Sequence, residues 1–103
     1  MREKYPHLFQ FFGGYFHEDW PLESPLWQDA VALFVKESKP ETVLAVYDEV
    51  TALRSETVDD KVLGRALFDL GSCYTPLPDG MSNSEWLQEI QKQLAQSFPI
   101  SAS

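Results

Sequence analysis

The sequence predicts an all-α fold, a small single-domain bundle of four to six helices that spans residues 1–103. Apolar residues recur at spacings of three and four along most of the chain, as in helices that bury one face. Helix-start signals precede several of these segments. No stretch of useful length alternates apolar and polar residues as a strand does, and helices joined by short loops pack as a bundle.

The first helix is expected from Tyr5 to about Phe16, within the most aromatic stretch of the chain. Seven of the fourteen aromatic residues lie between Tyr5 and Trp20, and aromatic side chains bury the largest apolar area. Pro6 suits a first turn, where its missing donor is not needed. Gly13-Gly14 either ends this helix or lets another backbone approach closely. The residues expected to form its core stripe are Tyr5, Phe9, Phe12 and Phe16.

A second helix is predicted to start with Ser24 as N-cap and Pro25 as first helical residue, and to end near Glu37. Its expected apolar stripe is Trp27, Ala30, Val31, Phe34 and Val35. A third helix starts after Lys39-Pro40, with Glu41 in the first turn and Arg54 in the last, which suits the helix dipole. Its apolar residues are Val43, Leu44, Val46, Tyr47, Val50 and Leu53.

Thr57-Val58-Asp59-Asp60 resembles a capped helix start with acids in the first turn, so a fourth helix is predicted to start there and to stop at Gly71. Its expected buried residues are Val62, Leu63, Ala66, Leu67 and Leu70. A Pro- and Gly-containing loop follows. The capping box over 82–85 then starts the last helix, which Pro99 ends. Its expected inward residues are Trp86, Leu87, Ile90 and Leu94.

The composition narrows the classes of partner. Sixteen acidic residues against eight basic ones give a net charge of −8. This disfavours nucleic acid and anionic membranes, because both are bound through basic contacts. It suits a basic protein partner, whose approach opposite charge accelerates, although acidity also simply keeps small proteins soluble. The absence of a signal-like or membrane-length apolar run predicts a cytoplasmic protein.

The only cysteine, Cys73, excludes an internal disulfide and thiolate-rich metal sites. No basic residue close to it in sequence lowers its pKa, so Cys73 is predicted to be a small buried hydrophobe. No nucleophile stands in a familiar catalytic setting. No cofactor is therefore expected, and the chain is predicted not to be an enzyme.

The polar cluster His17-Glu18-Asp19 is the first place to look for chemistry, and two interpretations of it remain open. Histidine and carboxylates bind zinc or iron, so His17 and Asp19 admit a small metal-dependent hydrolase. A metal site needs three or four converging ligands, and the only other histidine, His7, has no recognisable spacing. Alternatively, one of these side chains fixes a turn by hydrogen bonding. A general helical adaptor with an exposed apolar groove is a further possibility.

The stretch YPHLFQFFGGYFHEDW resembles the small immunity proteins of bacterial contact-dependent growth inhibition systems, the CdiI type. A second block, from Tyr74 to Leu87, resembles the closing loop and helix of that family. The middle of the chain matches only as helix of suitable length. The residues of this chain that match the shared pattern, expected to be structural, are Tyr15, Phe16, His17, Asp19, Trp20, Asp79, Gly80 and Trp86.

The resemblance implies a helical cytosolic inhibitor, monomeric when free, that binds the toxic C-terminal domain of a cognate CdiA effector. Such toxins are often basic nucleases, so an acidic surface is expected to occlude the active site, in keeping with the −8 charge. We expect Trp20 to anchor its segment near Trp86. The expected toxin-binding residues are Glu18, Glu23, Asp48, Glu49, Asp59 and Asp60.

Overall fold

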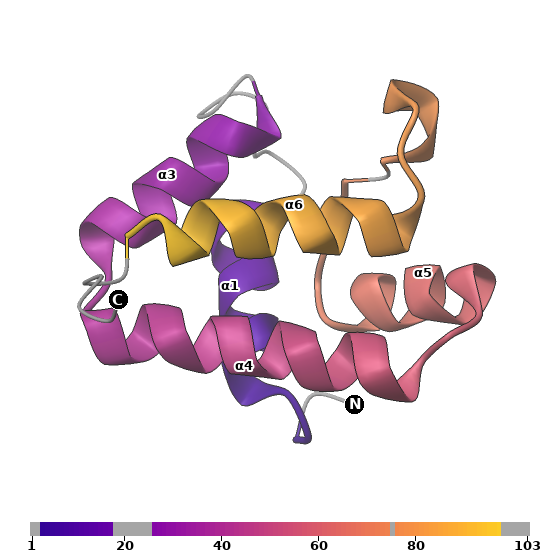
Figure 1. Ribbon diagram of the computed structural model, residues 1–103, viewed down its shortest axis with the longest axis horizontal. Helices are drawn as coiled ribbons and strands as arrows, with labels where there is room; N and C mark the ends of the chain where they lie inside the picture. Colours follow the sequence, from indigo (N-terminus) through magenta and orange to yellow (C-terminus); the bar gives the residue numbers. More distant parts are fainter. Residues whose placement is uncertain (1–2, 18–25, 75, 98–103) are drawn as a thin grey trace.

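The computed structural model describes residues 3–17, 26–74 and 76–97, and this part of the chain is all-α, as predicted (Figure 1). The described elements are α1 (Pro6–Tyr15), α3 (Trp27–Glu37), α4 (Pro40–Glu56), α5 (Asp60–Asp69), the short 3-10 turn η1 (Leu77–Asp79) and α6 (Asn83–Ala95). Helix α6 lies centrally and packs against α3, α4 and α5, while α1 packs against α3 and α4. None of these helices is long and apolar enough to cross a membrane.

One continuous core draws residues from all five α-helices, and Trp86 of α6 lies at its centre. The Trp86 side chain is fully buried, with ring centroids 5.3 Å from Phe16, 5.7 Å from Phe12 and 4.9 Å from Tyr74. Such edge-on and tilted pairs add specific attraction to the area they bury. The aromatic stretch of α1 is therefore core, as its helical spacing predicts.

The start of the second predicted helix differs from the expectation. Helix α3 begins at Trp27, because Leu26 has an extended backbone (φ −119°, ψ 147°) and acts as its N-cap residue without a side-chain cap. The predicted cap, Ser24, lies outside the described residues. At the other end of the chain, α6 ends at Ala95. Pro99, the predicted terminator, lies outside the described residues.

Gly13-Gly14 does not end the first helix, which continues to Tyr15. The second alternative applies, because the backbone of Gly71 approaches α1 at this point. A Cβ on Gly71 would lie 3.2 Å from the Cα of Gly13. Gly71 also has φ +100°, and its N–H and that of Ser72 bond back to the carbonyls of Phe68 and Leu67. This Schellman motif ends α5 at the predicted glycine.

The helix starts predicted at 57–60 and 82–85 are both present, but Asp59 is the N-cap of α5, whereas Thr57 ends α4. The Asp59 side chain accepts hydrogen bonds from the backbone N–H groups of Lys61 (2.8 Å) and Val62 (3.3 Å) at the start of α5. The Ser82 hydroxyl accepts from the N–H of Glu85, whose carboxylate accepts from the N–H of Ser82. This reciprocal arrangement is the predicted capping box.

Three residues predicted to be buried face solvent instead. Leu44 is 47% exposed, Val62 is 50% exposed, and Cys73 is exposed in the loop after α5. The two helical residues lie at the margins of their apolar stripes, where a shift of one helix position turns a side chain outward. The backbone N–H of Cys73 bonds to the carbonyl of Phe16, which fixes the loop against the end of α1 and leaves the thiol outside.

Candidate functional site

The predicted toxin-binding acids occupy different environments, and most of the described ones are engaged inside the molecule. Asp48 lies exposed on the outer face of α4. Glu49, next to it, points inward and is only 17% exposed. Asp59 caps α5, and Asp60 begins that helix. Glu18 and Glu23 lie outside the described residues.

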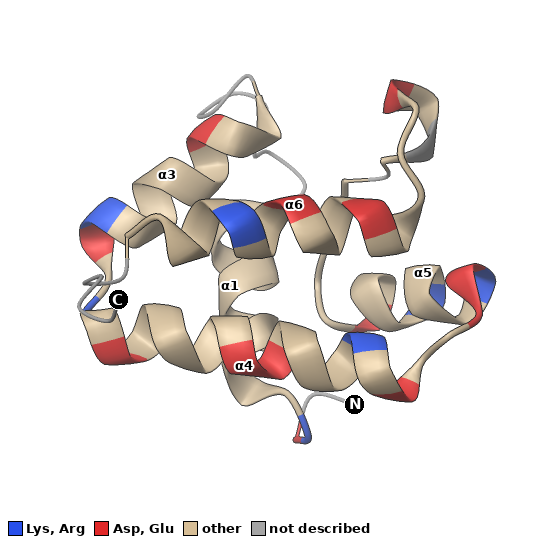
Figure 2. Cartoon of the chain, in the orientation of Figure 1, with Lys and Arg blue, Asp and Glu red and all other residues tan. Residues whose placement is uncertain are grey.

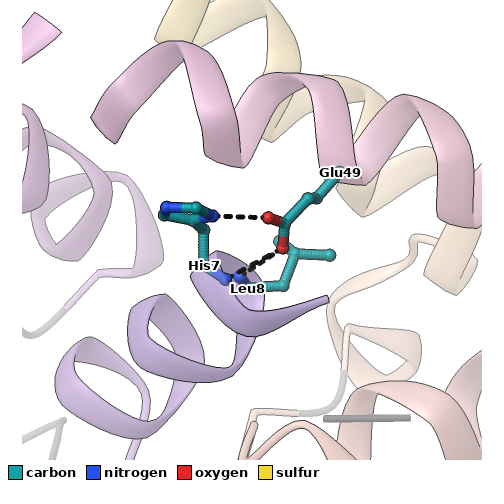
Figure 3. A network of polar contacts seen from close by, with 3 residues as sticks. All are labelled: His7, Leu8 and Glu49. Atoms are coloured by element: carbon teal, nitrogen blue, oxygen red, sulfur yellow. Dashed lines mark hydrogen bonds and ion pairs between the residues drawn. The ribbon is translucent and has the colours of Figure 1, made fainter. Parts of the chain in front are cut away.

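Glu49 caps helix α1 from a different part of the chain (Figure 3). Its Oε1 accepts hydrogen bonds from the backbone N–H groups of His7 (3.0 Å) and Leu8 (2.9 Å), and its Oε2 lies 2.6 Å from His7 Nδ1. Tyr5, the N-cap residue, supplies no side-chain cap, and Pro6 at the first position has no N–H. The carboxylate therefore satisfies the two helix-end donors that local sequence leaves unpaired.

Asp60 caps helix α6 in the same way, from a distant part of the chain. Its carboxylate accepts from the backbone N–H groups of Asn83 (3.2 Å) and Ser84 (3.1 Å) and from the Asn83 side-chain amide (3.0 Å). Asn83 also donates to the Asp60 carbonyl, so one residue of α5 is fixed to the first turn of α6. The local cap Ser82 and the distant carboxylate together stabilise the start of α6.

Of the family-pattern residues that the structure describes, Tyr15, Phe16 and Trp86 lie in or against the core, whereas Asp79 and Gly80 are exposed. Phe16 is fully buried, and Tyr15 packs on Phe34 while its hydroxyl donates to Glu37 (2.7 Å). Burial and this hydrogen bond raise the pKa of Tyr15 to about 12. His17 is half-buried, whereas Asp19 and Trp20 lie outside the described residues.

The closing loop of the second block is also held by its own side chains. The Tyr74 hydroxyl donates to Asp79 at the end of η1. Burial, followed by this hydrogen bond, raises the pKa of Tyr74. Gly80 has φ +87°, a conformation that favours glycine, so it turns the chain toward α6.

A metal centre is not assembled by the residues in view. Over 3–17, 26–74 and 76–97, no group of three or more histidine, cysteine, aspartate or glutamate side chains converges. The partner proposed for His17, Asp19, is not among those residues.

The outer face of α4 is acidic with an apolar residue at its middle. Residues 41, 44, 48, 51 and 55 are all exposed, and their spacing places them on one side of the helix. This α4 outer face carries Glu41, Leu44 and Asp48, and the acidic positions of α4 are red in Figure 2. Of the predicted acids that the structure describes, Asp48 is exposed and caps no helix.

A second surface feature, which sequence reasoning missed, lies on α5. An open hollow of about 670 Å³ separates this helix from the loop that follows it. We call it the α5 hollow, and its principal lining residues are Lys61, Arg65, Phe68, Cys73, Tyr74 and Asn83. Phe68 is 74% exposed there. The sequence contains one indication of this feature, because Phe68 falls outside the apolar stripe of α5. The buried residues of that stripe are Leu63, Ala66, Leu67 and Leu70.

The charged residues that line the α5 hollow are two basic ones and one acidic one. Lys61 and Arg65 lie one helical turn apart, and Asp69 lines the hollow with them; the basic positions of α5 are blue in Figure 2. The ion pairs formed within the described residues are Lys4–Glu56, His7–Glu49 and Lys92–Glu89. Neither Lys61 nor Arg65 takes part in them. The hollow therefore combines an exposed aromatic ring with two cations and one acidic residue.

Both the sequence and the fold are similar to those of known proteins. Residues 4–94 match the family of CdiI immunity proteins. The fold is similar to a chain of the structure described as the crystal structure of the CdiA-CT/CdiI complex from Y. kristensenii 33638. The TM-score is 0.83 at 26% sequence identity, over 88% of this chain and 98% of that one. No curated protein sequence gives a match. Because the family match extends over most of its length, the chain belongs to the CdiI immunity protein family.

Proposed function

We propose that this protein neutralises the toxic C-terminal domain of a cognate CdiA effector by binding it directly, without catalysis. Family membership and the similar fold of a chain from a CdiA-CT/CdiI complex support this proposal. The protein acts in the cytoplasm as one helical domain, and it is monomeric when free. Inhibition by binding requires one inhibitor for each toxin, so protection depends on the ratio of the two proteins.

The toxin is proposed to be a basic nuclease whose active site is covered by the acidic α4 outer face. The net charge of −8 supports this, since a cleft that holds a phosphate backbone is itself positive. Glu41 and Asp48 flank the exposed Leu44 on that face. An apolar residue surrounded by charges is the usual layout of a protein interface.

The direct test is co-expression with the toxin domain encoded immediately upstream. Cells that carry both genes should survive toxin induction, and the purified proteins should form a one-to-one complex. Death of the cells at the same rate with and without the immunity gene would reject the proposal.

The electrostatic part has its own test. Glu41→Gln combined with Asp48→Asn removes two charges and no helix cap, so the fold should be unaffected. This double variant should associate with the toxin more slowly and with a weaker dependence on salt. The matched control is Asp29→Asn combined with Glu89→Gln, two acids on α3 and α6 that cap no helix and lie off the α4 outer face. An association rate and salt dependence equal to those of the wild type would remove the α4 outer face from the mechanism.

A further inference from the structure

The α4 outer face is smaller than the surface that a stable complex usually buries. Five exposed positions lie along it, whereas specific interfaces use about 20–30 residues on each side. The contact must therefore extend onto neighbouring elements. Helix α5 follows α4 after only three residues, and of the helices α1, α3, α4 and α6 its main packing partner is α6. Its other side is available to a partner.

One large exposed aromatic ring borders the hollow. Phe68 is 74% exposed and lines it, whereas Val58 and Val62 are exposed but do not line it. Small soluble proteins expose single apolar residues routinely, but an exposed ring in the wall of a hollow is characteristic of an interaction surface. Phe68 and Arg65 are also of the residue types, aromatic and arginine, that are enriched in interface cores.

We propose that the α5 hollow receives an apolar side chain of the toxin domain, and that a carboxylate next to that side chain pairs with Lys61 and Arg65. This inference rests on the proposed function and specifies a second contact within it. The toxin domain is the occupant because the family match and the similar fold of a chain from a CdiA-CT/CdiI complex support it as the partner of this chain. A carboxylate of the toxin would meet two cations and one acid, Asp69, in the lining of the hollow.

The opposite signs of the two surfaces have a mechanistic meaning. The overall charge of −8 attracts a basic protein from a distance in many orientations. Two local cations accept only the orientation that brings an acidic residue of the toxin to α5. The net charge of the whole molecule thus raises the association rate. The local positive charge fixes the orientation of the bound toxin and selects the cognate one.

Two variants test the contact without touching the core. Phe68→Ser removes the exposed ring, and Arg65→Glu reverses one charge; both side chains face solvent, so urea unfolding should stay close to that of the wild type. Each should weaken binding of the purified toxin domain by about 10- to 100-fold, as expected for an interface hot spot. The matched controls are Val58→Ser, an apolar residue that is 91% exposed and outside the hollow, and Lys36→Glu on α3. Both controls should change the dissociation constant by less than about 3-fold.

The single cysteine provides an independent readout on the unmutated protein. Cys73 lines the α5 hollow and is exposed in the free chain. A maleimide reagent should modify it readily, and the modification should slow by about 10-fold or more when saturating toxin covers the hollow.

The outcomes separate the two proposals. If the wild type binds the toxin while Phe68→Ser and Arg65→Glu bind as tightly, or Cys73 stays equally reactive in the complex, the α5 contact is wrong and the proposed function stands. If the wild type does not bind, both are lost. A free protein that sediments as a dimer, and becomes monomeric with Phe68→Ser, would assign the hollow to a second copy and overturn the inference.

Discussion

The carboxylate of Glu49 is expected to be one of the largest polar contributions to stability in this protein. Glu49→Ala removes the acceptor of two backbone N–H groups, one of which belongs to the fully buried Leu8. Loss of a helix cap costs about 0.5–2 kcal/mol, and a buried donor left unpaired costs about 1–3 kcal/mol. We therefore expect the free energy of unfolding to fall by about 2–4 kcal/mol, a large share of the roughly 5–15 kcal/mol typical of a domain.

The measurement is urea unfolding followed by tryptophan fluorescence. With a slope of about 1–3 kcal/mol per molar urea, the midpoint should fall by roughly 1–2 M. Glu49→Gln is the informative partner variant, because both backbone N–H groups bond to the same oxygen, Oε1, which glutamine keeps. It should lose only about 1 kcal/mol, the difference between a charged and a neutral acceptor.

Asp48→Ala is the matched control, since the residue before Glu49 is exposed and should change stability by less than about 0.5 kcal/mol. Equal midpoints for Glu49→Ala and Asp48→Ala would show that the α1 cap has no energetic weight and would refute the reasoning.

Three further changes should also alter stability. Gly71→Ala should cost about 1–3 kcal/mol in thermal unfolding, because φ +100° is strained for alanine and the new Cβ would press on Gly13; an unchanged Tm would contradict this. Burial and the hydrogen bond to Glu56 raise the pKa of Tyr5 from 10.0 to about 12, so stability present below pH 10 is lost as pH rises toward 12. Tyr5→Phe should remove the part of the loss of stability at alkaline pH that ionisation of Tyr5 causes. Absorbance of tyrosinate should then show one fewer tyrosine with a raised pKa. Trp86→Ala should cost about 3–5 kcal/mol and abolish near-ultraviolet circular dichroism, whereas an intact signal would deny Trp86 its central place in the core.

The helices were predictable because their signals are local. The capping box of Ser82 and Glu85 joins residues three positions apart and lies where the sequence placed it, and the cap of α5, Asp59, lies inside the predicted start at 57–60. The apolar stripes were equally informative in their centres. They failed at their margins, where Leu44 and Val62 face solvent, because neighbouring helices decide which edge of a stripe is covered.

The roles of the acidic residues were not predictable, because they depend on tertiary contacts. Glu49 bonds to residues more than forty positions away, and Asp60 to residues 23 and 24 positions away. In the sequence both look like members of exposed acidic pairs. The α5 hollow was hidden for the same reason, since it forms only when the loop carrying Cys73 folds back along α5. Net charge suggested a kind of partner, but it did not indicate which side chains remain available to it.

The cap that α4 provides for α1 also bears on how the chain folds as it leaves the ribosome. Helix α1 has only ten residues and contains Gly13-Gly14, so it has little tendency to persist alone. The N–H groups at its start lack their acceptor until Glu49 is synthesised, some forty residues later. The most aromatic segment is thus the first to be made and cannot be secured until α4 has emerged, which makes early α1 a natural client for chaperones that bind exposed aromatic chain.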